Sequence, residues 1–281
     1  MLSKRRHTIL PEISRWLITP VFPAAVLLSA ACIIMSIMVE SVDSDMFLAG
    51  AKLSVFGYII SGAQSGFIAK VSLCLCSLPA AGMYAEDYAE NAAYARVQRT
   101  GHFRYALGRV LHAAMSAWLC AFLAELVCVL VMAVFMGMPL ARLEDNYNWY
   151  VITDNLLAAG REYEFLFISS GIFGFKAAFY ALLAVAFSVF VPNRQAVIAV
   201  PILCWYFNQY LLGSKVAPWL PDWLKPSLLY AEEHILTRAM SISEWQLFWL
   251  VLAITTAVAG VVFLLLFFRV RRNGVFGGGE S

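Results

Sequence analysis

The sequence predicts an all-α polytopic membrane protein with six transmembrane helices. Hydrophobic residues make up 62% of its 281 residues, only 14% are charged, and the mean hydropathy is +0.75. At that composition a soluble domain would expose far too much apolar surface. Six apolar stretches alternate with polar segments, and each approaches the roughly 20 residues that a bilayer requires. We place the spans at 16–39, 53–82, 105–136, 165–191, 195–213 and 247–268.

The distribution of Lys and Arg predicts the orientation of these spans. If the amino terminus lies inside, most basic residues fall in the cytoplasmic segments, whereas the outer segments hold most of the acids. Cytoplasmic loops carry this excess of positive charge in membrane proteins. The formal net charge of +2 conceals the division. We therefore expect both termini to be cytoplasmic, in a multi-pass protein of the cell membrane.

A single transmembrane domain, 1–281, is expected. An amphipathic helix at 1–15 precedes the first span, because Ile9, Ile13 and Trp16 share one helical face. It should lie on the inner membrane surface, in contact with lipid headgroups. The six spans occupy 16–268, and an outer loop at 214–245 should form short interfacial helices before span six. A cytoplasmic tail is expected at 269–281.

Between spans two and three, residues 83–103 predict a cytoplasmic helix. Acids open the segment and cations close it, which matches the helix macrodipole, and Gly101 is a suitable helix end. The charged residues available for a partner are Glu86, Asp87, Glu90, Arg96 and Arg99. A helix this long exceeds what a simple connection needs. A docking helix is thus favoured over a solvated connector.

Three ionisable residues fall inside predicted spans: Lys70, Glu125 and Lys176. Charged groups in a bilayer are costly and usually have partners or a function. Glu125 and Lys176 lie at similar depths from the predicted outer ends of spans three and four. They are expected to form an ion pair, which either fixes helix register or lines a substrate path. Lys70 is expected to extend toward the membrane surface or to line a cavity on the substrate path, and no partner is predicted for it.

Sites for catalysis or metal binding are hard to find in the sequence. The histidines are scattered without metal-ligand spacing, and the six cysteines all lie in predicted spans, so neither a metal site nor a disulfide framework is expected. The phosphate-binding sequence Gly-x-x-x-x-Gly-Lys-Ser/Thr is absent. Glu232, Glu233 and Arg238 are similar to the motif of intramembrane prenyl-protein-type proteases. However, the arginine comes one residue late and the segment falls in an outer loop.

This arrangement resembles the type-2 permease subunit of ATP-binding cassette transporters along nearly the whole chain. The local resemblance lies in Met83-Tyr-Ala-Glu-Asp-Tyr-Ala-Glu-Asn, in Arg99-Thr-Gly and in Tyr105-x-x-Gly-Arg109. It implies that residues 83–103 are a coupling helix that docks onto a nucleotide-binding ATPase subunit. Under this resemblance the docking contacts are Glu86, Asp87, Glu90, Arg96 and Arg99. The family pattern does not require the three charges inside the spans.

The resemblance also implies a mechanism and a set of partners. Two permease copies, or this chain with a related permease, would enclose a cavity that exports an amphipathic substrate such as a peptide, a drug or a lipid-linked molecule. ATP and Mg²⁺ would bind to the partner subunits, so no cofactor, enzymatic activity or nucleic-acid partner is expected in this chain. Two alternatives stay open. One is a protease-like enzyme that uses Glu232 and Glu233, and the other is a membrane scaffold or sensor whose connector binds a different partner.

Overall fold

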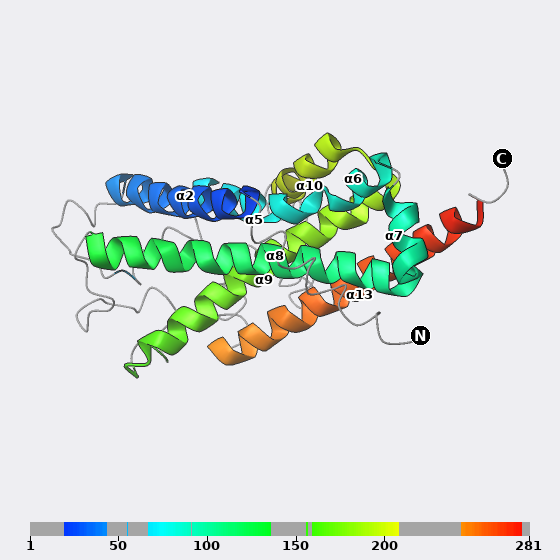
Figure 1. Cartoon of the computed structure of the whole chain (residues 1–281). Helices are drawn as coiled ribbons and strands as arrows, with labels where there is room; N and C mark the ends of the chain where they lie inside the picture. The colour runs from blue at the N-terminus through cyan, green and yellow to red at the C-terminus, as the bar shows by residue number, and fades with distance from the viewer. Residues whose placement is uncertain are drawn as a thin grey trace.

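The computed structural model is helical throughout its described part, which comprises residues 20–43, 55, 67–90, 92–135, 156, 159–207 and 243–276 (Figure 1). No strand occurs among these residues. The elements in chain order are α2 (Val21–Asp43), α5 (Phe67–Ala81), α6 (Met83–Ala89), α7 (Ala92–Thr100), α8 (His102–Leu130), a π-helical turn η1 (Val131–Phe135), α9 (Glu162–Phe190), α10 (Arg194–Tyr206) and α13 (Glu244–Phe276).

Among the described residues, three helices are long and apolar enough to cross a membrane: His102–Phe135, Glu162–Phe190 and Glu244–Arg272. They coincide with predicted spans three, four and six. The described apolar parts of α2, α5 and α10 are shorter, but they overlap predicted spans one, two and five. An all-helical membrane protein is therefore supported. The count of six spans and the orientation of the termini stay predictions.

Helix α9 lies at the centre of the bundle and packs against α5, α8, α10 and α13. Its apolar segment is 72% buried, whereas that of α13 is 22% buried. One apolar cluster joins α2, α5, α8 and α9, and it includes Ile33, Cys76, Cys120 and Ala177. Small residues along α8 and α9 allow this close packing in a membrane, where helix association depends on van der Waals contact.

Two glycines of α9 mark its closest approaches to neighbouring helices. A Cβ at Gly174 would lie 2.7 Å from the Trp118 ring of α8, and one at Gly171 would lie 2.7 Å from the Phe248 ring of α13. The indole Nε1 of Trp118 also donates a hydrogen bond to the Gly171 carbonyl at 3.2 Å. These contacts fix the register between α8 and α9.

The connector between α5 and α8 consists of two helices, α6 and α7, rather than the one predicted (Figure 1). The chain turns at Glu90, and α7 ends at Gly101, whose φ of 82° confirms it as the helix end. The break has a physical reason. Asp87 and Arg96 are nine residues apart and form an ion pair. In one straight helix they would lie on opposite faces, about 13 Å apart along the axis.

Two predicted features lie outside the described residues: the helix at 1–15 and the part of the outer loop from 214 to 242. Glu232, Glu233 and Arg238 belong to that loop. Helix α13 continues to Phe276, so the first residues of the predicted cytoplasmic tail at 269–281 are helical, and the location of the tail stays a prediction.

Candidate functional site

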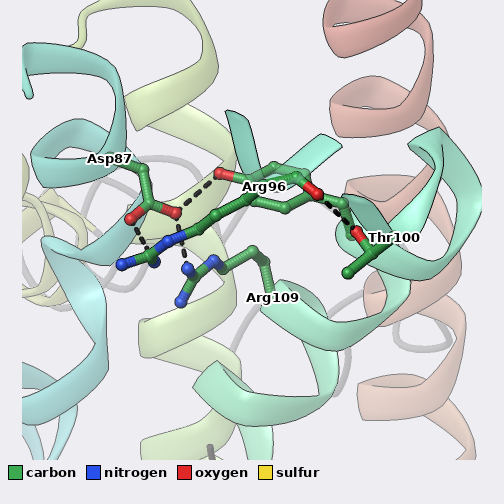
Figure 2. A network of polar contacts seen from close by, with 5 residues as sticks. Asp87, Arg96, Thr100 and Arg109 are labelled. Atoms are coloured by element: carbon green, nitrogen blue, oxygen red, sulfur yellow. Dashed lines mark hydrogen bonds and ion pairs between the residues drawn. The ribbon is translucent and has the colours of Figure 1, made fainter. Parts of the chain in front are cut away.

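The connector is attached to the bundle by the carboxylate of Asp87. Arg96 of α7 donates a hydrogen bond to Asp87 Oδ1 at 2.5 Å, and Tyr105 of α8 donates one to Oδ2 at 2.7 Å. Arg109, one turn further along α8, places Nη2 2.6 Å from Oδ2. Figure 2 shows the guanidinium groups of Arg96 and Arg109 meeting the Asp87 carboxylate from the same side. One carboxylate thus joins α6, α7 and α8.

These side chains meet because of local helical geometry. Tyr105 and Arg109 are four residues apart and share one face of α8, which is turned toward the connector. The Arg109 guanidinium also lies over the Tyr105 ring, 5.4 Å from its centroid. Thr100 donates a hydrogen bond to the Arg96 carbonyl at 2.9 Å and so closes the last turn of α7. Tyr105 and Arg109 therefore contact each other as well as Asp87, and the backbone that carries Arg96 is held by Thr100.

The network is partly shielded from water. The Asp87 and Arg109 side chains are 5% and 9% exposed, while Arg96 is 43% exposed. A buried carboxylate is tolerated where opposite charges and hydrogen bonds compensate its lost hydration. Below the network, an apolar cluster of Tyr84, Val97, Tyr105, Leu182 and Val270 joins the connector to α8, α9 and α13. The connector is thus attached to the bundle both by the polar network around Asp87 and by this apolar cluster.

Glu86 provides a second attachment, to the start of α10. Its Oε1 lies 2.9 Å from Arg194 Nε, and both side chains are partly exposed. Asn193 caps α10 by accepting hydrogen bonds from the backbone N–H groups of Gln195 and Ala196. Gly82 leaves room for the Arg194 side chain, whose Cγ would lie 3.3 Å from a Cβ at that position. The connector therefore contacts α8, α9 and α10.

The outward surface of the connector is formed by Tyr88, Glu90, Tyr94 and Arg99, all exposed. We call these four residues the connector face. Among the docking contacts implied by the family resemblance, Glu90 and Arg99 belong to this face. Glu86 and Arg96 are partly exposed and paired within the chain. Asp87 is different, because its buried carboxylate holds the connector together and cannot reach a partner directly.

Sequence reasoning missed Tyr105, Arg109 and Arg194 as members of this site. Tyr105 and Arg109 were noted as part of the family resemblance but not as contacts of Asp87, although their i, i+4 spacing was a usable signal. Nothing in the sequence indicates that Arg194 meets Glu86, since that contact depends on how α10 packs against α6.

Inside the bundle, Glu125 is buried and its Oε1 accepts a hydrogen bond from Ser169 of α9 at 3.0 Å. Glu125 is therefore level with Ser169. Lys176 follows seven residues later on α9, about 10 Å further along the axis. The ion pair expected between Glu125 and Lys176 stays a prediction. Lys176 itself is buried, and Lys70 lies in α5.

Within the described part of the chain, no three His, Cys, Asp or Glu side chains gather in a way that would hold a metal ion, and all six cysteines are free thiols. No family model matches the chain, and neither a curated protein nor a solved structure shows significant similarity to it. The geometry of the connector and of the helices that it contacts is therefore the basis for inferring function.

Proposed function

We propose that this chain is the membrane-spanning permease subunit of an ATP-binding cassette transporter. In this proposal the connector face binds a separate ATP-hydrolysing subunit that holds ATP and Mg²⁺. A second permease, identical or related, completes the substrate path in the cell membrane. The transported molecule is amphipathic, such as a peptide, a drug or a lipid-linked compound, and it is exported.

The single observation that carries the proposal is the combination of an exposed surface with a buried anchor in one short connector. Tyr88 and Tyr94 are 44% and 51% exposed, whereas Asp87 behind them is 4% exposed and bonded to α8. A solvated loop needs no such anchor. A partner that pushes on the connector face would move α8 directly through Asp87, and α10 through Glu86 and Arg194.

This arrangement supports alternating access as the mechanism. Packed helices switch between discrete arrangements rather than deform continuously. The apolar cluster beneath the connector includes residues of α8, α9 and α13. Movement of the connector would therefore be shared among the three helices that are long enough to span a membrane. The driving force would come from ATP binding and hydrolysis in the partner subunit.

Photo-cross-linking in native membranes tests this proposal. Tyr88, Tyr94 and Tyr163 are each replaced by p-benzoylphenylalanine in the full chain. Tyr163 is the matched control, because it is an exposed tyrosine on the first turn of α9, away from the connector. Mass spectrometry identifies the cross-linked proteins. An ATPase subunit captured at Tyr88 and Tyr94, but not at Tyr163, is the expected result.

A charge-reversal variant provides a second readout. Glu86→Lys combined with Arg99→Glu should abolish co-purification of the ATPase, while the chain remains folded. Exposed ion pairs contribute only about 0–1 kcal/mol, so losing the Glu86–Arg194 contact should not unfold it. Capture of no ATPase at any position would overturn the proposal. Capture at the connector face of a protein without ATPase activity would instead favour a membrane scaffold or sensor.

A further inference from the structure

Glu244, on the first turn of α13, occupies a position where the helix otherwise buries apolar side chains. The buried residues of this part of α13 are spaced i, i+3, i+4 and i+7, which places them on one face: Glu244, Leu247, Phe248 and Val251. The three apolar members pack against the first half of α9 in one cluster. Glu244 is therefore a carboxylate at the start of an apolar stripe that faces α9.

The described chain provides no counter-ion for this carboxylate. Glu244 is 3% exposed, and its Oε1 has no hydrogen-bond partner among the described residues. No described basic residue forms an ion pair with it, and Arg161 at the start of α9 is paired with Glu164 instead. A buried carboxylate without a partner costs free energy. A cation is the ligand that would compensate that cost.

Glu244 is not needed to cap α13. The backbone N–H of Gln246 donates a hydrogen bond to Ser243 Oγ at 3.3 Å, and the N–H of Ser243 donates one to Gln246 Oε1 at 2.8 Å. These two bonds form a reciprocal capping box. The helix dipole favours a negative charge in the first turn, but it does not require that the charge be buried. The burial of Glu244 therefore needs another explanation.

An aromatic group lies next to Glu244, with Phe248 at its centre. The Phe248 ring centroid is between 5.3 and 6.1 Å from the centroids of four other rings, those of Phe167, Phe175, Trp245 and Trp249. Two of the rings come from α9 and two from α13, so the aromatic group spans the contact between these helices. Ring faces are electron-rich and attract cations.

The aromatic group connects Glu244 with the exposed surface of the bundle. Successive residues of an α-helix are about 100° apart, so Phe248 lies about 40° and Trp249 about 140° from Glu244, in the same direction around α13. Trp245 lies between them at about 100°. Phe248 is 8% exposed and Trp249 is 59% exposed. A ligand on the exposed rings can therefore reach the carboxylate along one side of α13.

We propose that Glu244 and the aromatic group form a binding site for a hydrophobic organic cation of the ammonium or phosphonium class. The positive charge meets Glu244, Phe248 and Trp245, and the apolar part lies on the exposed rings of Phe167 and Trp249. An inorganic cation would not need the rings, and a neutral apolar molecule would not need the carboxylate. The inference rests on the proposed function for its role, because it makes the transported amphipathic substrate a cation.

Equilibrium binding of radiolabelled tetraphenylphosphonium to the purified full chain in mild detergent tests the site. Binding to empty micelles is subtracted, and tetraphenylborate, which has the same shape and the opposite charge, is the matched probe. Glu244→Gln removes the charge at nearly constant size, and Trp245→Leu removes one ring. Glu162→Gln is the control, because Glu162 is a half-buried acid on the first turn of α9. Size-exclusion chromatography confirms that each variant is folded.

The wild-type chain should bind tetraphenylphosphonium saturably and tetraphenylborate much more weakly. Glu244→Gln should weaken phosphonium binding by about tenfold or more, because the charge pair is shielded from water. Trp245→Leu should weaken it by about threefold through the lost cation–π contact. Glu162→Gln should leave it unchanged. Equal effects of Glu244→Gln and Glu162→Gln, equal binding of the two probes, or no saturable binding would each overturn the site.

The outcome is separable from that of the proposed function, because the binding assay contains no ATPase. Failure to bind the phosphonium, combined with capture of an ATPase at Tyr88 and Tyr94, would overturn the cation site alone. Specific binding that depends on Glu244, without capture of an ATPase, would support the site and overturn the transporter proposal.

Discussion

Arg109 Nη2 of α8 lies 2.6 Å from Asp87 Oδ2 of α6, and this contact attaches the connector to the longest described apolar segment of the chain. The Arg109 side chain is 9% exposed and the Asp87 side chain is 5% exposed. Each charge has therefore lost most of its hydration and depends on the other. Because each charge needs the other, the Asp87–Arg109 contact holds the connector in its place on α8.

Removing the Asp87 carboxylate should destabilise the protein strongly. Asp87→Ala leaves Arg109 buried without its counter-ion, and breaking a buried pair from one side costs about 3 kcal/mol or more. Glu90→Ala is the matched control, because Glu90 is an exposed acid three residues away and should change stability by less than about 0.5 kcal/mol. Denaturant unfolding in detergent measures both changes. Equal stability of the two variants would contradict the anchoring role of Asp87.

The Tyr105 hydroxyl should contribute less than the carboxylate that it contacts. Tyr105→Phe removes a donor to Asp87 at 2.7 Å but keeps the ring beneath Arg109. A hydrogen bond to a charged group contributes about 1.5–3 kcal/mol. Because the two arginines still compensate Asp87, we expect a loss near the lower limit. In the double variant with Asp87→Ala and Tyr105→Phe, the loss of unfolding free energy should be smaller than the sum of the losses in the two single variants. The reason is that both residues belong to one network.

Two glycine substitutions should have opposite effects. Gly174→Ala places a Cβ 2.7 Å from the Trp118 ring and 2.9 Å from its backbone carbonyl oxygen, so the α8–α9 contact must open. Overpacking of this kind costs about 1–3 kcal/mol. Gly260→Ala meets no atom within 4 Å, and it should stabilise α13 by about 0.5–1 kcal/mol through helix propensity. Thermal unfolding in detergent compares the two, and a stabilising Gly174→Ala would mean that α8 and α9 pack differently.

Ser169→Ala should reveal how far Glu125 depends on its hydrogen bond. The substitution removes a 3.0 Å donor from a carboxylate that is 2% exposed, with an expected loss of about 1–3 kcal/mol. Thr256→Ala is the control, because that exposed hydroxyl donates only to the Leu252 carbonyl of its own helix. Glu125→Gln keeps an acceptor for Ser169 and should be milder than Ser169→Ala in the same assay. The reverse order would indicate that Glu125 needs its charge.

Much of the helical architecture could be predicted from the sequence, because hydrophobicity along the chain is a local property. The predicted limits of span four, 165–191, differ by only a few residues from α9 at Glu162–Phe190. Gly101 was also predicted as a helix end, since glycine adopts a positive φ at little cost. Span three was predicted to begin at Tyr105, whereas α8 begins at His102.

The candidate site was only half predictable. The sequence shows that acids lie at the start of the connector and cations at its end. It does not show which of these residues face outward. Asp87 and Glu90 are both acids in one short polar segment, yet Asp87 is buried and Glu90 is exposed. The difference depends on the turn at Glu90 and on where Arg109 lies in α8. Neither can be deduced from the composition of the connector.

The sequence by itself determined the helical membrane class, the approximate helix limits and the presence of a charged helical connector, because local hydrophobicity and propensity act within one segment. Only the tertiary structure decided that Asp87 joins three helices, that Glu86 meets Arg194, and that Glu125 accepts a hydrogen bond from Ser169. Those contacts depend on the register between helices. That register is set by close approaches such as Gly174 against Trp118, which involve residues far apart in the chain.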